Sequence, residues 1–194
     1  MIQFRTMKKS LFVLLTGWML CAPVYSGTVW QAVMVESNEV PATGSPATGF
    51  SLVSLSGNML SVHVDWTGLI GGTPAAAHIH CCAAPGVNVG VAVGFPNFPT
   101  TLSGTYDGVF DLLDPNIYTA AFRNGFGGGT AAGAEAALLA GLDAGLAYTN
   151  IHNSVFPGGE IRGLLVSAPE PASMLLNSGG LIGLVWARRR AQRG

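Results

Sequence analysis

The chain has 194 residues, of which 49% are hydrophobic and only 10% are charged. A typical soluble domain carries roughly 25% charged residues, and disordered chains are richer in charge still, so this composition excludes an intrinsically disordered protein. The formal net charge of −1 provides no basic groove, which excludes a nucleic-acid-binding protein and predicts no nucleic-acid partner.

The first 26 residues have the composition of a secretory signal peptide. Basic Lys8 and Lys9 precede a short apolar run over 11–20, and small residues follow up to Ser26. A run of about 10 apolar residues is short for a membrane span, which needs about 20. We therefore expect export and cleavage after Ser26, with a retained N-terminal anchor as the alternative.

Residues 27–168 form the predicted mature domain, and nine acidic against two basic side chains give it a net charge of −7. Such a surface repels phosphate polymers and attracts cations. Leu60, Val62 and Val64 alternate with polar residues, which is the period of a strand with one buried face. Further strands are expected at 28–35, 75–80, 147–152 and 160–166.

One stretch of this domain departs from the strand pattern. Residues 130–142 are Ala-rich and predict a short helix, preceded by a Gly-rich loop over 125–129. Many short strands with one short helix indicate an all-β domain, built as an antiparallel sandwich or barrel.

Three of the expected strands carry an Ile between two polar residues. Residues i and i+2 of a strand share a face, so we expect the Ile side chains in the core. The polar side chains are then expected together on the other face, either on a surface or in a cleft beneath a loop. These polar residues are His78, His80, Asn150, His152, Glu160 and Arg162.

Two interpretations of this polar face remain open. In the first, His78, His80 and His152 bind one Cu or Zn ion, with Glu160 as a further ligand or an orienting partner. In the second, the histidines belong to a structural hydrogen-bond network in which Glu160 pairs with Arg162 or His152. The other members of that network are Asn150, Glu160 and Arg162.

Cys81 and Cys82 are the only cysteines of the mature domain. In an oxidising compartment they can bond within the chain only to each other, as a disulfide between adjacent residues. The alternatives are two free thiols, or soft ligands for Cu(I) or Zn beside His80.

The last 26 residues contain three parts in a set order. They are the triplet Pro169, Glu170 and Pro171, an apolar stretch over 172–187, and the cluster Arg188, Arg189 and Arg190. A helix over the 16 apolar residues spans about 24 Å, slightly less than the ~30 Å hydrocarbon core of a bilayer.

This order resembles the PEP-CTERM sorting signal of Gram-negative bacteria. The resemblance implies membrane contact through 169–194 in an inner-membrane intermediate and processing by an exosortase. Delivery to the cell surface or the extracellular matrix would follow. A plain C-terminal membrane helix is the alternative.

Five motifs follow one another in the mature domain. They are Asn38-Glu39-Val40-Pro41, Trp66-Thr67-Gly68-Leu69, Ala77-His78-Ile79-His80, Tyr148-Thr149-Asn150-Ile151-His152 and Pro157-Gly158-Gly159-Glu160-Ile161-Arg162-Gly163. Their order resembles the CHRD domain, which implies an immunoglobulin-like or superoxide-dismutase-like barrel with no agreed biochemical activity. Cys81-Cys82 departs from the Gly-Pro that commonly follows the His pair in that family.

The expected function is that of an exported, non-catalytic binding or structural module, with extracellular proteins or polysaccharide as partners. No nucleophile elbow and no phosphate-binding loop is evident, so the sequence leans away from an enzyme without excluding one. A two-metal dismutase centre is not expected, because no His lies between His80 and His152. A secreted protein with one Cu or Zn ion is the alternative.

Overall fold

The computed structural model describes residues 28–168. The strands are β1 (Val29–Val35), β2 (Thr48–Ser56), β3 (Met59–Thr67), β4 (Ala76–His80), β5 (Val91–Gly94), β6 (Gly104–Asp111), β7 (Tyr148–His152), β8 (Ile161–Leu164) and β9 (Val166–Ser167). The helices are the 3-10 turns η1 (Glu36–Asn38) and η2 (Pro115–Ile117) and the α-helices α1 (Ala120–Gly125) and α2 (Ala131–Asp143).

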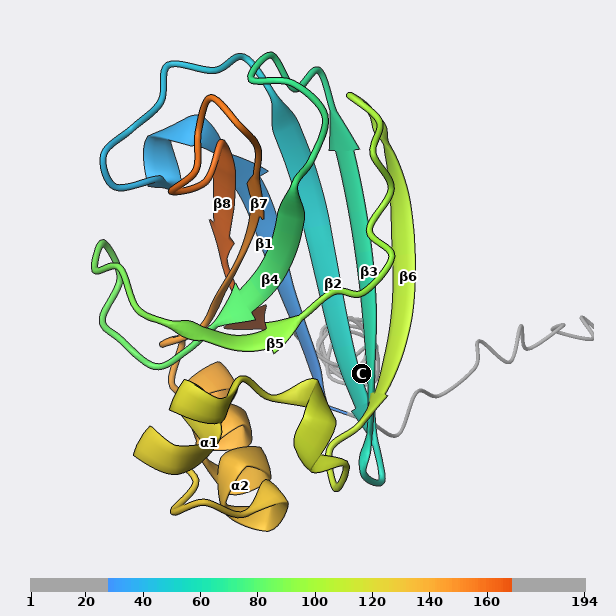
Figure 1. Cartoon of the computed structure of the whole chain (residues 1–194), viewed down its shortest axis with the longest axis vertical. Coiled ribbons are helices and arrows are strands. Elements are labelled where there is room, and N and C mark those ends of the chain that lie inside the picture. The colour runs from blue at the N-terminus through green and yellow to red at the C-terminus, as the bar shows by residue number, and fades with distance from the viewer. Residues whose placement is uncertain (1–27, 169–194) are drawn as a thin grey trace, which may run out of the picture.

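All nine strands belong to one antiparallel sheet in the order β5-β4-β7-β8-β1-β2-β3-β6, with β9 paired to β1. The sheet curls into a half-barrel, and the two α-helices lie together at one end of it (Figure 1). The prediction of an all-β antiparallel sandwich or barrel is therefore confirmed.

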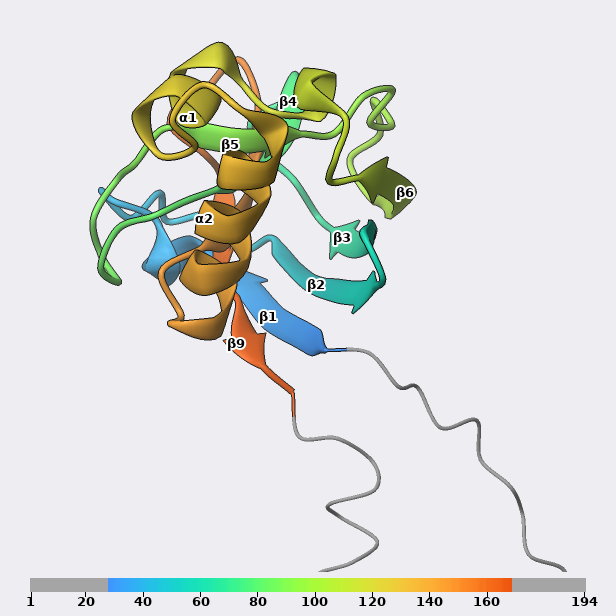
Figure 2. The same ribbon diagram turned by 90° about the horizontal axis from the view of Figure 1, so that it is seen from below.

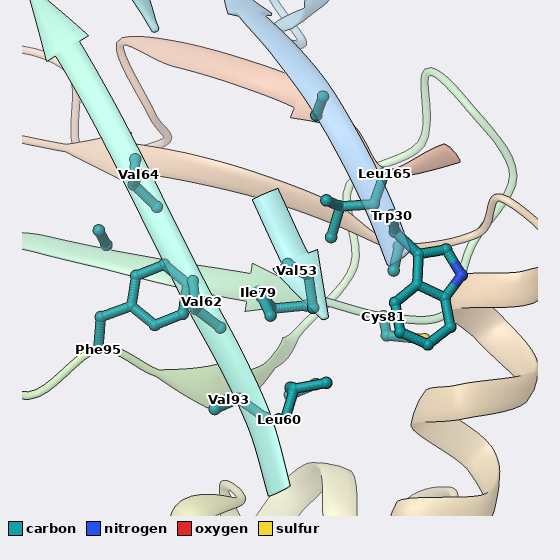
Figure 3. Close-up of a cluster of buried hydrophobic side chains, with 14 of the residues drawn as sticks. Trp30, Val53, Leu60, Val62, Val64, Ile79, Cys81, Val93, Phe95 and Leu165 are labelled. Carbon is teal, nitrogen blue, oxygen red and sulfur yellow. The ribbon is translucent and has the colours of Figure 1, made fainter. Parts of the chain in front are cut away.

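The core is one cluster of buried apolar side chains that several strands contribute (Figure 3). The alternation read from β3 is confirmed, because Leu60, Val62 and Val64 are all buried. Trp30 and Ile79, from β1 and β4, belong to the same apolar cluster. Side chains from strands far apart in the sequence thus meet in a single core.

The helix predicted over 130–142 is present as α2, and its start is capped because the Thr130 side chain accepts a hydrogen bond from the Gly133 amide. Its buried residues include Ala134, Leu138 and Leu142, which lie four positions apart and therefore on one face. Figure 2 shows α2 in front of the sheet, beside α1. The prediction of one helix missed α1, whose six residues are too few to show a helical period.

β2, β5 and β6 lie where the sequence pattern predicts no strand. The two ends of the described chain are neighbours, since β9 pairs with β1 and the Ala168 amide donates to the Val29 carbonyl. The predicted signal peptide and the predicted sorting segment fall outside residues 28–168. Among the helices of this range, none is long and apolar enough to cross a membrane.

Candidate functional site

The site lies on β4 and β7, where the alternation of each strand divides apolar from polar side chains. Ile79 and Ile151 are fully buried in the core, as predicted. The antiparallel register sets His78 directly opposite Asn150 and His80 opposite Tyr148. Because His152 lies two residues beyond Asn150, all these polar side chains share the face away from the core.

Three histidines meet on this face. The ring centroid of His78 lies 5.0 Å from that of His152 and 5.5 Å from that of His80, and the His80 and His152 centroids are 5.7 Å apart. One nitrogen atom of each ring lies within 4.8 Å of the corresponding atoms of the other two. The predicted convergence of the three imidazoles is therefore present.

Backbone carbonyl groups fix the protons of two of these rings. The Nδ1 atom of His80 lies 2.7 Å from the Val89 oxygen, and Nδ1 of His152 lies 2.9 Å from the Pro157 oxygen. A carbonyl can only accept, so each Nδ1 donates and each neutral ring presents a lone pair at Nε2. Within the described residues, both Nε2 atoms are buried without a hydrogen-bond partner, as is Nδ1 of His78.

The surroundings keep these imidazoles neutral near pH 7. Burial, followed by the nearby His152 and His80, lowers the pKa of His78 to about 4. Burial also lowers the pKa of His80 to about 4, although its hydrogen bond to Val89 opposes the change. The pKa of His152 is lowered by burial as well. Neutral imidazole is the form that binds a metal ion.

A stack of side chains supports His80 on the same face. The Tyr148 ring lies parallel to the His80 ring with centroids 4.7 Å apart, and the Arg162 guanidinium carbon lies 4.0 Å from the Tyr148 centroid. Arg162 also forms a buried ion pair of 2.8 Å with Glu39 and donates to the Asn88 side chain at 2.6 Å. Arg162 thus lies in a buried polar network, but its anionic partner is Glu39 and not the expected Glu160.

A comparison with known protein families matches residues 30–165 to the CHRD domain. This chain belongs to the CHRD domain family. No curated protein and no solved structure is significantly similar to it.

Glu39 and Tyr148 are site residues of this CHRD domain that the reasoning from side-chain chemistry missed. Glu39 precedes a turn and carries no strand period, but it stands in the Asn-Glu-Val-Pro motif on which the family resemblance rests. Tyr148 precedes Asn150 by two residues, so the alternation of β7 was the signal that could have identified it.

Glu160 does not join the histidines of the CHRD domain, which corrects the prediction that it ligates the metal or pairs with His152 or Arg162. Its fully buried carboxylate accepts hydrogen bonds from the Ser45 hydroxyl at 2.6 Å and from the Ile70 amide at 2.7 Å. The Gly71 amide and the Asn153 side chain are further donors. Glu160 immediately precedes β8, and its hydrogen bonds connect three loops next to the site.

Cys81 and Cys82 also lie apart from the histidine cluster. Their sulfur atoms are bonded in the structure, and Cys81 is fully buried among core side chains (Figure 3). A Cβ atom added to Gly141 of α2 would overlap both sulfur atoms, so the pair packs against that helix. The group of convergent ligands does not include the cysteines, which contradicts their interpretation as metal ligands beside His80.

The fourth histidine of the chain, His63 on β3, lies outside this cluster. Its ring nitrogens lie 2.8 Å from an Asp107 oxygen and 3.0 Å from an Asp65 oxygen. The hydrogen bond with Asp107 is the largest cause of its raised pKa, and Asp65 adds to it. His63 is thus a partly exposed residue of the sheet surface, paired with two carboxylates.

Proposed function

We propose that this chain is an exported CHRD module that holds one divalent Zn or Cu ion in a non-catalytic role. One observation carries the proposal. Three buried imidazole nitrogens, on His78, His80 and His152, converge without hydrogen-bond partners in the described part of the chain. A buried polar atom without a partner costs roughly 1–3 kcal/mol, which a bound ion would offset.

The arrangement of the rings supports a metal ion. In a tetrahedral site with Zn–N bonds of about 2.0–2.1 Å, the ligand nitrogens lie about 3.4 Å from one another. The candidate nitrogens of the three histidines lie within 4.8 Å of one another, so small rotations of the side chains would complete this geometry. The Val89 and Pro157 carbonyls orient two rings in the way that carbonyl partners usually orient metal-binding histidines. His78 also lines an open groove of about 770 Å³.

Metal content tests the proposal. Protein purified without chelators, and then reconstituted with Zn or Cu and desalted, is expected to hold one ion per chain by plasma mass spectrometry. At a free metal concentration 100 times the dissociation constant, binding stabilises the fold by about 2.7 kcal/mol, which gives a measurable rise in Tm. Substoichiometric metal together with an unchanged Tm would refute the proposal.

Single alanine variants locate the ion. His78→Ala, His80→Ala and His152→Ala are each expected to lose the ion, because two imidazoles alone bind it far more weakly. His63→Ala is the matched control, since His63 is paired with Asp107 and Asp65 away from the cluster. Equal metal loss in the His63 variant would indicate non-specific binding.

The export of the chain is a separate part of the proposal. It is supported by the signal-peptide composition of residues 1–26 and by the order of the triplet, apolar stretch and Arg cluster in 169–194. We expect an inner-membrane intermediate, exosortase cleavage, and a final place at the cell surface or in a polysaccharide-containing matrix. Mass spectrometry of the native protein is expected to find the N-terminus at Gly27 and a C-terminus near Pro169. An intact chain in the cytosol would contradict this part alone.

A further inference from the structure

Asn150 lies on the same face of the sheet as the three histidines. It lies directly opposite His78 in the register of β4 and β7, two residues before His152, and diagonally across from His80. Directly opposed side chains of antiparallel strands have Cβ atoms about 4.5–5.5 Å apart, and diagonal neighbours remain within reach. Asn150 is 0% exposed, so its amide group must find its partners inside the protein.

The two ends of this amide have different surroundings. The Nδ2 atom donates to the Gly158 carbonyl at 3.4 Å. A Cβ atom added to Gly159 would lie 2.7 Å from this Nδ2 atom and would also overlap the Glu39 carboxylate. The nitrogen end of the amide therefore points toward the loop at Gly158 and Gly159 and toward Glu39. Oδ1 therefore lies at the other end of the amide, where it is buried without a hydrogen-bond partner in the described residues.

Four unpartnered polar atoms thus share one buried region. In the neutral rings, Nε2 of His80 and Nε2 of His152 carry lone pairs, because Nδ1 of each ring donates to a carbonyl. Oδ1 of Asn150 and Nδ1 of His78 are the other two unpartnered atoms. Acceptors that face one another repel unless a cation or a hydrogen-bond donor lies between them, and no protein group of the described residues donates to any of the four.

We propose that Oδ1 of Asn150 is the fourth donor to the metal ion, so that the site consists of three imidazole nitrogens and one amide oxygen. This inference rests on the proposed metal-binding function. An oxygen donor favours a divalent ion over the softer Cu(I), which prefers sulfur ligands. The Gly158 carbonyl accepts a hydrogen bond from the nitrogen end of the amide. The Glu39 carboxylate lies near the same loop and is paired with Arg162.

Affinity measurements on the full chain test this inference. The dissociation constants for Zn²⁺ and Cu²⁺ are measured by competition with a chelating indicator for the wild type, Asn150→Ala and Asn150→Asp. Asn150→Ala is expected to weaken binding about 10- to 100-fold, the size of effect seen when groups that support a metal site are removed. Asn150→Asp keeps the shape and adds charge, so it is expected to bind Zn²⁺ at least as tightly as the wild type. Asn124→Ala, on the exposed side of α1, is the matched control and is expected to bind like the wild type.

The visible spectrum of the Co²⁺-substituted protein gives a second readout that loss of folding alone does not imitate. The wild type and Asn150→Asp are expected to show the intense bands of a four-coordinate ion, whereas Asn150→Ala is expected to change their position and intensity. Wild-type affinity and an unchanged Co²⁺ spectrum in Asn150→Ala would overturn the inference while leaving the three-histidine site intact. If Asn150→Ala does not fold, a weaker affinity of Asn150→Asp than of the wild type would overturn it. Failure of the wild type to bind any metal would instead refute the proposed function.

Discussion

Burial determines the protonation of His78 and His80, and it also makes the fold sensitive to acid. The pKa of each is about 4 in the folded state against 6.5 as the ordinary value. The unfolded chain therefore binds more protons than the native protein between these two pH values. The contribution of these two neutral imidazoles to the unfolding free energy is fully present above pH 6.5 and is lost as the pH falls toward 4.

We expect the unfolding free energy of the metal-free protein to fall between pH 6.5 and pH 4 by on the order of 2–3 kcal/mol for each of these imidazoles. Urea unfolding with a chelator present, repeated across this range, measures the slope. The double variant His78→Gln/His80→Gln is expected to lose most of this pH dependence. An identical slope in the variant and the wild type would contradict the assignment.

His63 is expected to show the opposite pH dependence, because its folded pKa is raised by Asp107 and Asp65. The pairing of His63 with the two carboxylates stabilises the fold below pH 6.5, and this contribution is lost as the pH rises through the raised pKa of the folded state. His63→Gln should therefore cost at most about 1 kcal/mol at pH 6, the usual limit for an exposed pair, and nothing at pH 9. Thermal melts at the two pH values measure the difference, and an equal loss at both would contradict the prediction.

The buried pair of Arg162 and Glu39 makes the third residue-level prediction. Their side chains are 5% and 2% exposed, and desolvation raises the pKa of Glu39 against the opposing attraction of Arg162. Arg162→Met leaves a buried carboxylate without its cation and is expected to cost about 3–5 kcal/mol. The double variant Arg162→Met/Glu39→Gln is expected to recover part of this loss in urea unfolding. No recovery would show that the two charges are not coupled.

At the scale of elements, the contact between α2 and the cysteine pair depends on one glycine. A helix normally gains about 0.5–1 kcal/mol when an interior Gly becomes Ala. At Gly141 the added Cβ would overlap the sulfur atoms of Cys81 and Cys82, so helix and strand end approach each other closely only because this residue lacks a side chain.

Gly141→Ala is therefore expected to destabilise the protein by about 1–3 kcal/mol, the usual cost of overpacking a core. Ala140→Gly, at an exposed position of the same helix, is the control and is expected to cost about 1 kcal/mol through helix propensity alone. Chemical denaturation of both variants tests this. Stabilisation by Gly141→Ala would mean that the helix does not pack on the cysteine pair.

At the scale of the whole molecule, the apolar core and the candidate site both lie within the described residues. The two ends of this range are side by side, because β9 pairs with β1 (Figure 2). The folded unit thus presents its two ends at one place on the sheet.

A chain limited to residues 27–168 is accordingly expected to fold with a stability within about 0.5 kcal/mol of the same chain carrying 169–194. It is also expected to bind the same amount of metal. Paired denaturation curves and metal analyses of the two chains make the comparison. A loss of several kcal/mol on shortening would show that the C-terminal segment contributes to the fold.

The sequence by itself determined the family, most of the strands, and the division of several of them into an apolar and a polar face. The reason is local, since a strand alternates with a period of two whatever its partners are. This alternation was sufficient to predict that His78, His80 and His152 share a face with Asn150. The short motifs around the histidines also carried the family resemblance.

Only the tertiary structure decided which polar groups become partners. Glu160 and Arg162 are two residues apart, yet one binds Ser45 and the loop at Ile70, while the other binds Glu39. These partners are 90 or more residues away along the chain, and the register of the sheet and the paths of its loops bring them into contact. No pattern within one strand contains that information, because a period of two describes a face and not what lies against it.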